Sequence, residues 1–139
     1  MTVFRAALIY YAIIFACGTV LGIVRNMLLV PRLGSTAAVA LEIPVMLALS
    51  WLVCGAILGR LAVPAPIPAR IAMGATALAL LWLSEALLAM VLGAGASSFF
   101  TAFTTPAGAL GALAQLAFAA FPVLRRQTGR VARDDQRLH

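Results

Sequence analysis

The sequence predicts an all-α integral membrane protein, with four transmembrane helices arranged as two hairpins and both termini in the cytoplasm. Hydrophobic residues make up 64% of the 139 residues and charged residues only 10%. Polar side chains are too few to cover the surface of a water-soluble fold of this size. The apolar residues also gather in four long runs, whereas a membrane β-barrel shows short alternating segments.

The four apolar runs set the expected spans. A transmembrane helix needs about 20 predominantly apolar residues. The sequence offers such runs at residues 6–24, 36–58, 71–92 and 107–124. We therefore expect one transmembrane domain, residues 1–124, followed by a basic cytoplasmic tail, residues 125–139.

The connector between the second and third spans, residues 60–70, contains proline at positions 64, 66 and 68 in the stretch VPAPIPAR. Alternating proline cannot continue a helix and favours an extended, stiff segment. We expect this segment to set the distance between the two hairpins.

The arginines orient the chain, because cytoplasmic loops of membrane proteins carry an excess of basic residues. With four spans both termini share one side. That side would hold Arg5, Arg60, Arg70, Arg125, Arg126, Arg130, Arg133 and Arg137, and the other side only Arg25 and Arg32. The pattern predicts a multi-pass protein of the bacterial inner membrane with cytoplasmic termini.

Two acids lie inside the predicted spans at the same depth. Counting about 1.5 Å of rise per residue places Glu42 roughly 9 Å and Glu85 roughly 10 Å below the extracytoplasmic surface. Gln115 lies roughly 12 Å below that surface, and Gly18 of the first span lies at a similar level. All four helices are therefore expected to meet in one polar layer.

Charged groups in a membrane helix require partners. An ionised side chain at the helix centre costs about 2.5 to 3.5 kcal/mol on insertion scales. Arg25 and Arg32 lie near the same surface as the acids, and arginine suits bidentate pairing with a carboxylate. We expect Arg25 and Arg32 to neutralise Glu42 and Glu85, and these four residues with Gln115 to form an ion- or solute-binding cluster.

Proline and glycine modify the expected helices. Pro44 has no N–H, so it releases the carbonyl group of Ala40, and a kink there would expose an acceptor near Glu42. Small residues permit close helix packing. Such residues recur four positions apart, as Gly18 with Gly22 in the first span, and as Ala107 with Gly111 and Gly108 with Ala112 in the fourth. We expect these four glycines to serve helix packing. Because four short helices can hardly enclose a pathway alone, we also expect a homo-oligomer.

The leading functional hypothesis is binding or translocation of a small ion or solute, with a glutamate changing protonation as the coupling step. One alternative is a non-catalytic structural or assembly subunit of a larger membrane complex, in which the charged pairs only lock helices together. A lipid-acting membrane enzyme is the third. We predict no catalytic residue, no metal site and no cofactor. The expected partners are the lipid bilayer, further copies of the chain and a larger membrane complex, but not nucleic acid.

Overall fold

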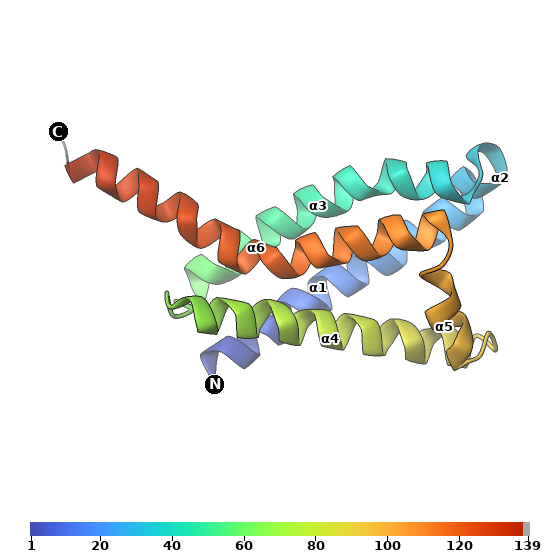
Figure 1. The fold of residues 1–139 in the computed structure, drawn as a ribbon, viewed down its shortest axis with the longest axis horizontal. Helices are drawn as coiled ribbons and strands as arrows, with labels where there is room; N and C mark the ends of the chain where they lie inside the picture. Colours follow the sequence, from blue (N-terminus) through green and yellow to red (C-terminus); the bar gives the residue numbers. More distant parts are fainter. Residues whose placement is uncertain (138–139) are drawn as a thin grey trace.

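The structure is a computed structural model that describes residues 1–137, and it describes their side chains except those of Ala96 and of residues 126–137. Within this range the chain is helical and contains no strand (Figure 1). The helical segments, in chain order, are α1 (Thr2–Val24), η1 (Arg25–Leu29), α2 (Val30–Leu33), α3 (Ser35–Arg60), α4 (Ile67–Val91), α5 (Ala96–Ala102) and α6 (Pro106–Arg137).

The prediction of an all-helical protein is confirmed for the described residues, and so is the prediction of four helices that could span a membrane. Four helical stretches in the described residues are long and apolar enough to cross a membrane. These are Thr2–Leu33, Ser35–Arg60, Ile67–Val91 and Pro106–Arg125.

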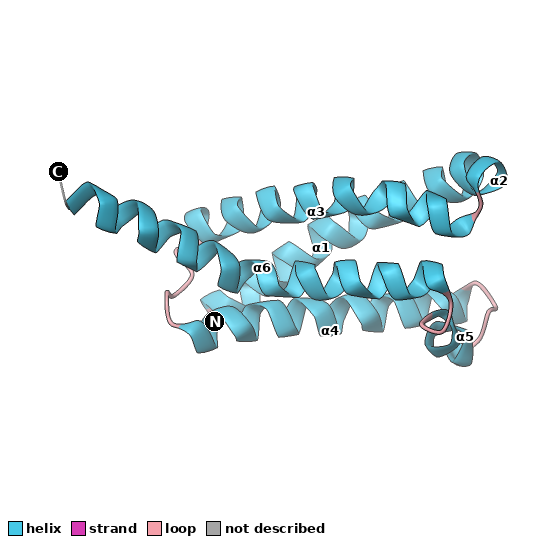
Figure 2. Ribbon diagram, turned by 45° about the horizontal axis from the view of Figure 1, so that its top comes forward, coloured by secondary structure: helices cyan, strands magenta, loops and turns pink. Residues whose placement is uncertain are grey.

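The four long helices form a closed ring (Figures 1 and 2). Each helix packs against two neighbours, in the order α1, α3, α6, α4 and back to α1. Figure 1 shows both termini at the end of the bundle where α3 connects to α4, whereas α2 and α5 lie at the opposite end. We call these ends the terminal end and the α5 end.

The first helical stretch is longer than the sequence predicted, because the chain does not turn after residue 24. α1 passes into the π-helical segment η1, in which the Val30 N–H donates to the Arg25 carbonyl oxygen, and then into α2. Pro31 follows this wide turn, since a proline ring collides with the carbonyl group four residues earlier unless the helix opens. The stretch ends at Gly34, whose φ of 80° is left-handed and costs glycine little.

The connector between α3 and α4 is shorter than predicted. α3 ends at Arg60 and α4 begins at Ile67, so residues 61–66 lie between them. Pro68 falls in the first turn of α4 instead of in the connector. Proline is favoured there because its missing N–H would have no helical partner at that position.

Arg70 belongs to α4 and not to a loop. Its side chain is buried, and its guanidinium donates to the carbonyl oxygens of Pro64 at 3.0 Å and Val63 at 3.2 Å. Charge-assisted hydrogen bonds of this kind are stronger than those between neutral groups. Arg70 therefore fixes the proline-containing connector against the start of α4.

The apolar core occupies the terminal half of the bundle. The Tyr10 ring stacks on Phe118 with 4.3 Å between ring centroids, and the Tyr10 hydroxyl donates to the Phe118 carbonyl oxygen at 3.0 Å. Cys54 and Met73 are fully buried in the same core. Tyr10 thus joins α1 to α6 across the ring and closes the bundle toward the terminal end.

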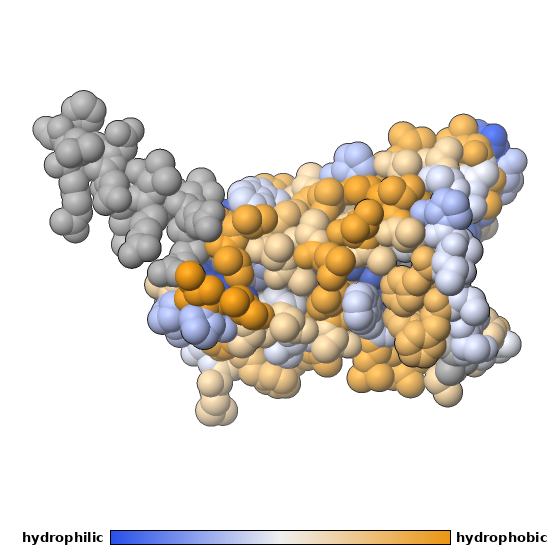
Figure 3. All heavy atoms as spheres, viewed as in Figure 1, coloured by the Kyte–Doolittle hydropathy of each residue, from blue (hydrophilic) through white to orange (hydrophobic). Residues whose placement is uncertain are grey.

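The outer surface is apolar along the helices. Large hydrophobic side chains are exposed on all four long helices, including Leu8, Leu52, Leu83 and Leu113. Figure 3 shows this apolar surface, with hydrophilic colours mainly toward the two ends. A surface of this kind is suited to contact with lipid.

Candidate functional site

A cavity of about 620 Å³ occupies the half of the bundle toward the α5 end. All seven helical segments contribute to its lining. Most lining residues are apolar, and the polar ones are Thr19, Arg25, Asn26, Ser35, Glu42, Ser50, Glu85, Thr105 and Gln115. Both intramembrane acids therefore border the same space as Arg25 and Gln115.

Arg25 and Glu42, which both line the cavity, form an ion pair. Nη1 of Arg25 donates to Oε2 of Glu42 at 2.8 Å. The two side chains are only 27% and 12% exposed, respectively. Gly22 lies beside the guanidinium, and a Cβ there would be in ordinary van der Waals contact with Nη2 of Arg25, at 3.8 Å. Arg25 is the first residue of η1, so the widened turn lies where the arginine reaches α3.

A hydrogen-bonded chain of three side chains joins α4 to α6. Nε1 of Trp82 donates to Oε1 of Gln115 at 2.7 Å, and Nε2 of Gln115 donates to Oε1 of Glu85 at 2.6 Å. An indole N–H can only donate, so the Gln115 oxygen must face Trp82 and its amino group must face Glu85. The chain therefore presents Oε1 of Glu85 with a hydrogen-bond donor.

The second carboxylate oxygen of Glu85, Oε2, has no hydrogen-bond partner among the described residues. Arg25 acts on Glu85 electrostatically but makes its ion pair with Glu42. Among the described lining residues Arg25 is the only basic side chain, facing two acids. With both acids ionised, the cavity carries one negative charge in excess.

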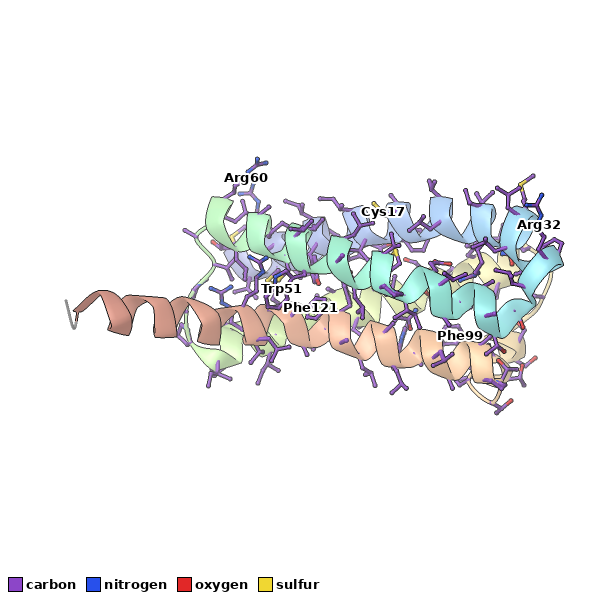
Figure 4. The ribbon with its side chains drawn as sticks, turned by 90° about the horizontal axis from the view of Figure 1, so that it is seen from above. Cys17, Arg32, Trp51, Arg60, Phe99 and Phe121 are labelled. Atoms are coloured by element: carbon purple, nitrogen blue, oxygen red, sulfur yellow. The ribbon has the colours of Figure 1, made fainter. Side chains whose placement is uncertain are left out.

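Arg32 does not join this cluster, which corrects the expectation that it neutralises an acid. Its side chain is exposed, and Figure 4 shows it at the outer end of the bundle. Because η1 and α2 continue the first helical stretch, Arg32 lies about 10 Å further along the axis than Arg25. A short turn would have kept both arginines near the acids.

Pro44 lies on the opposite side of α3 from Glu42. Two positions along a helix differ by about 200° around its axis, so the carbonyl group that Pro44 releases faces away from the acid. Pro44 is exposed, and neither it nor Ala40 lines the cavity. The released Ala40 acceptor is therefore not part of the site.

The four glycines predicted to pack helices all line the cavity. A Cβ at Gly18 would meet only the Met46 side chain, at 3.5 Å, and one at Gly111 would meet nothing within 4 Å. Gly108 is the exception, because a Cβ there would overlap the carbonyl oxygen of Ala102 in α5. Three of the four glycines therefore give the cavity its space, and Gly108 lets α5 approach α6.

The described residues contain no group of three or more His, Cys, Asp or Glu side chains that could hold a metal ion. The cavity instead combines one incompletely bonded carboxylate with a large apolar wall. Comparison of the chain with protein-family models, with curated proteins and with solved structures found no match. The chemistry of the cavity is thus the basis for a functional proposal.

A second polar cluster, at the terminal end, was not predicted. The Arg125 guanidinium lies over the Trp51 ring, 4.6 Å from its centroid, and Phe121 meets the same ring edge-on at 5.3 Å. Figure 4 shows Trp51 and Phe121 side by side. A Cβ at Gly55 would overlap the Arg125 guanidinium, so this glycine makes room for it. In the sequence, this cluster is indicated only by Trp51 and Gly55, which lie one helical turn apart. That spacing places an aromatic ring next to a position without a side chain on the same helix face.

Proposed function

We propose that this chain is a bacterial inner-membrane protein that binds a small ion or solute in the cavity and moves it across the membrane. The single observation that carries the proposal is the cavity itself, a space of about 620 Å³ that holds Arg25, Glu42 and Glu85 between apolar helices. Ligand pockets commonly measure about 300 to 1,000 Å³ and combine an apolar wall with a few polar groups.

The charges support a functional role more than a purely structural one. A structural pair needs one acid for one arginine, and the Arg25–Glu42 contact already provides that. Glu85 is a further acid whose described hydrogen bond comes from a neutral amide. Ionisable residues inside a membrane domain are costly and commonly mark the path of an ion or substrate.

The proposed topology has two helical hairpins and cytoplasmic termini, as the distribution of arginine favours. In that orientation the α5 end faces the extracytoplasmic side, and the cavity belongs to that side. The Tyr10–Phe118 contact lies between the cavity and the cytoplasm. Transport then requires that this contact opens while the α5 end closes.

The test is flux of protons, K⁺, Na⁺ and Cl⁻ into liposomes that contain the purified protein. Gly111→Leu places a side chain in the cavity lining at a position where an added Cβ would meet no atom within 4 Å. Gly59→Leu is its matched control, because Gly59 is also helical and also has open space, but it does not line the cavity. We expect Gly111→Leu and Glu85→Gln to abolish flux and Gly59→Leu to retain it.

Each variant is first shown by size-exclusion chromatography to assemble as the wild type does. Full flux in Gly111→Leu would exclude the cavity as the path. Absence of flux in the wild type for every ion tested, and for an organic cation such as benzyltrimethylammonium, would favour the alternative of an assembly subunit.

A further inference from the structure

We infer that the occupant of the cavity is an organic cation with a single positive charge and an apolar body, bound with its charge beside Glu85. This inference rests on the proposed function, since it names the class of solute that the cavity binds. Three features of the cavity determine the class: the excess charge, the position of the incompletely bonded oxygen, and the wall.

The excess charge selects a cation. Arg25 is already paired with Glu42 at 2.8 Å, so neither is available to balance the charge of a ligand. Glu85 has no ion-pair partner among the described residues, and when it is ionised an uncompensated carboxylate in a low-dielectric space is costly. A monocation removes that cost, whereas an anion would add a second like charge.

The hydrogen bonds fix where the cation binds. Trp82 holds the Gln115 amide in one orientation, and Gln115 holds Oε1 of Glu85. Oε2 of Glu85 has no partner among the described residues, and the side chain lines the cavity. The carboxylate is thus positioned before a ligand arrives, which lowers the entropic cost of binding.

The wall selects a ligand with an apolar body over a bare inorganic ion. Four phenylalanines line the cavity: Phe15, Phe99, Phe103 and Phe118. Their rings offer apolar contact and cation–π attraction. Na⁺, K⁺ or Ca²⁺ would need several oxygen ligands to replace their water shells. Among the described residues that line the cavity, Glu42 and Glu85 are the only acids.

The experiment uses two probes that differ only in charge. Benzyltrimethylammonium carries one positive charge, and neopentylbenzene is its neutral analogue with carbon in place of nitrogen. Benzenesulfonate serves as the anionic comparison. Binding to the purified full-length protein in nanodiscs is measured by equilibrium dialysis, after subtraction of uptake by empty nanodiscs, for the wild type, Glu85→Gln, Gly111→Leu and Gly59→Leu.

We expect the cation to bind the wild type at least about tenfold more tightly than the neutral analogue. Glu85→Gln should remove that preference and leave weak binding of the neutral probe. Gly111→Leu should abolish binding of both, and Gly59→Leu should behave as the wild type. If Glu85→Gln does not assemble, two comparisons still test the inference. The wild type should prefer the cation to the neutral analogue, and Gly111→Leu but not Gly59→Leu should lose binding of the cation.

Equal binding of the two probes, or preference for benzenesulfonate, would overturn the cation inference and leave the proposed solute cavity standing. Binding of the cation that Glu85→Gln and Gly111→Leu both leave unchanged would also overturn it, because the cation would then lie elsewhere. If no probe binds the wild type while ion flux remains sensitive to Gly111→Leu, the occupant is an inorganic ion. The inference then fails, but the proposed function does not.

Discussion

At the scale of single residues, the site depends on which side chains have partners. Arg25 and Glu42 form an ion pair with one another. Glu85 accepts a hydrogen bond only from the Gln115 amide among the described residues. The sequence predicted that these residues share a layer, because counting positions along helices gives depth. Counting could not predict which arginine reaches which acid. That outcome depends on the π-helical turn at Arg25, because the helix continues past it and carries Arg32 to the tip of the α5 end.

The first prediction at this scale concerns the ion pair. Arg25→Met keeps most of the side-chain volume but leaves Glu42 without its partner, so we expect the free energy of unfolding to fall by about 2 to 3 kcal/mol. Adding Glu42→Gln should restore part of that loss, with a coupling energy of about 1 to 3 kcal/mol. The measurement is equilibrium unfolding in mixed detergent micelles.

Arg32→Met is the matched control for the ion-pair prediction. Arg32 is exposed at the end of the bundle, so this change should alter the free energy of unfolding by no more than about 0.5 kcal/mol. Equal losses from Arg25→Met and Arg32→Met would mean that the Arg25–Glu42 contact contributes nothing specific.

At the scale of helices, hydropathy predicted the elements well and their ends less well. The four apolar stretches are helices because lipid provides no partner for backbone polar groups. Helical structure nevertheless continues through Arg25–Leu33 and through Pro68, where charge and proline interrupt the apolar pattern. Hydropathy reports contact with lipid, whereas a helix continues wherever its backbone hydrogen bonds and sterics allow.

One glycine at a close contact between two long helices was also not predicted. Gly74 of α4 lies directly against the backbone of Ala119 in α6, and a Cβ at this position would overlap the Ala119 carbonyl oxygen. The glycines predicted to pack helices were identified by their spacing within one helix. Close approach depends on the facing helix, which spacing within one helix does not reveal.

Gly74→Ala should therefore force α4 and α6 apart. We expect the free energy of unfolding to fall by about 1 to 3 kcal/mol, since overpacking a tight contact displaces backbone. Gly59→Ala adds the same methyl group to a helix with open space and should stabilise by up to about 1 kcal/mol, because alanine has the higher helix propensity. Thermal unfolding of both variants in one detergent provides the comparison. Equal effects of the two changes would show that α4 and α6 do not meet at Gly74.

At the scale of the whole molecule, one chain encloses the cavity. The ring of α1, α3, α6 and α4 surrounds it, and the four glycines expected to pack helices line it. The proposed solute binding would therefore need no second copy, although a homo-oligomer was expected from the sequence because four short helices can hardly enclose a pathway alone. The expected basic tail lies largely outside the described side chains, although the backbone of α6 continues as a helix to Arg137.

The proposed topology predicts which end of the bundle reacts from outside the cell. In a background with Cys17→Ala and Cys54→Ala, a membrane-impermeant maleimide should label Ser97→Cys at the α5 end of intact cells. It should label Arg60→Cys at the terminal end only after permeabilisation. Both positions are exposed, and Figure 4 shows Arg60 directed away from the bundle. The reverse labelling pattern would place the termini outside.

The hydrogen bond between Trp82 and Gln115 also gives the protein an intrinsic optical reporter. The chain contains two tryptophans, and the other, Trp51, lies beneath Arg125 at the terminal end. Trp51→Phe would leave a single indole, two hydrogen bonds away from Glu85. A charge arriving at that carboxylate changes the electric field along the indole dipole, so the emission wavelength of Trp82 would report occupancy of the cavity in real time, without an added label.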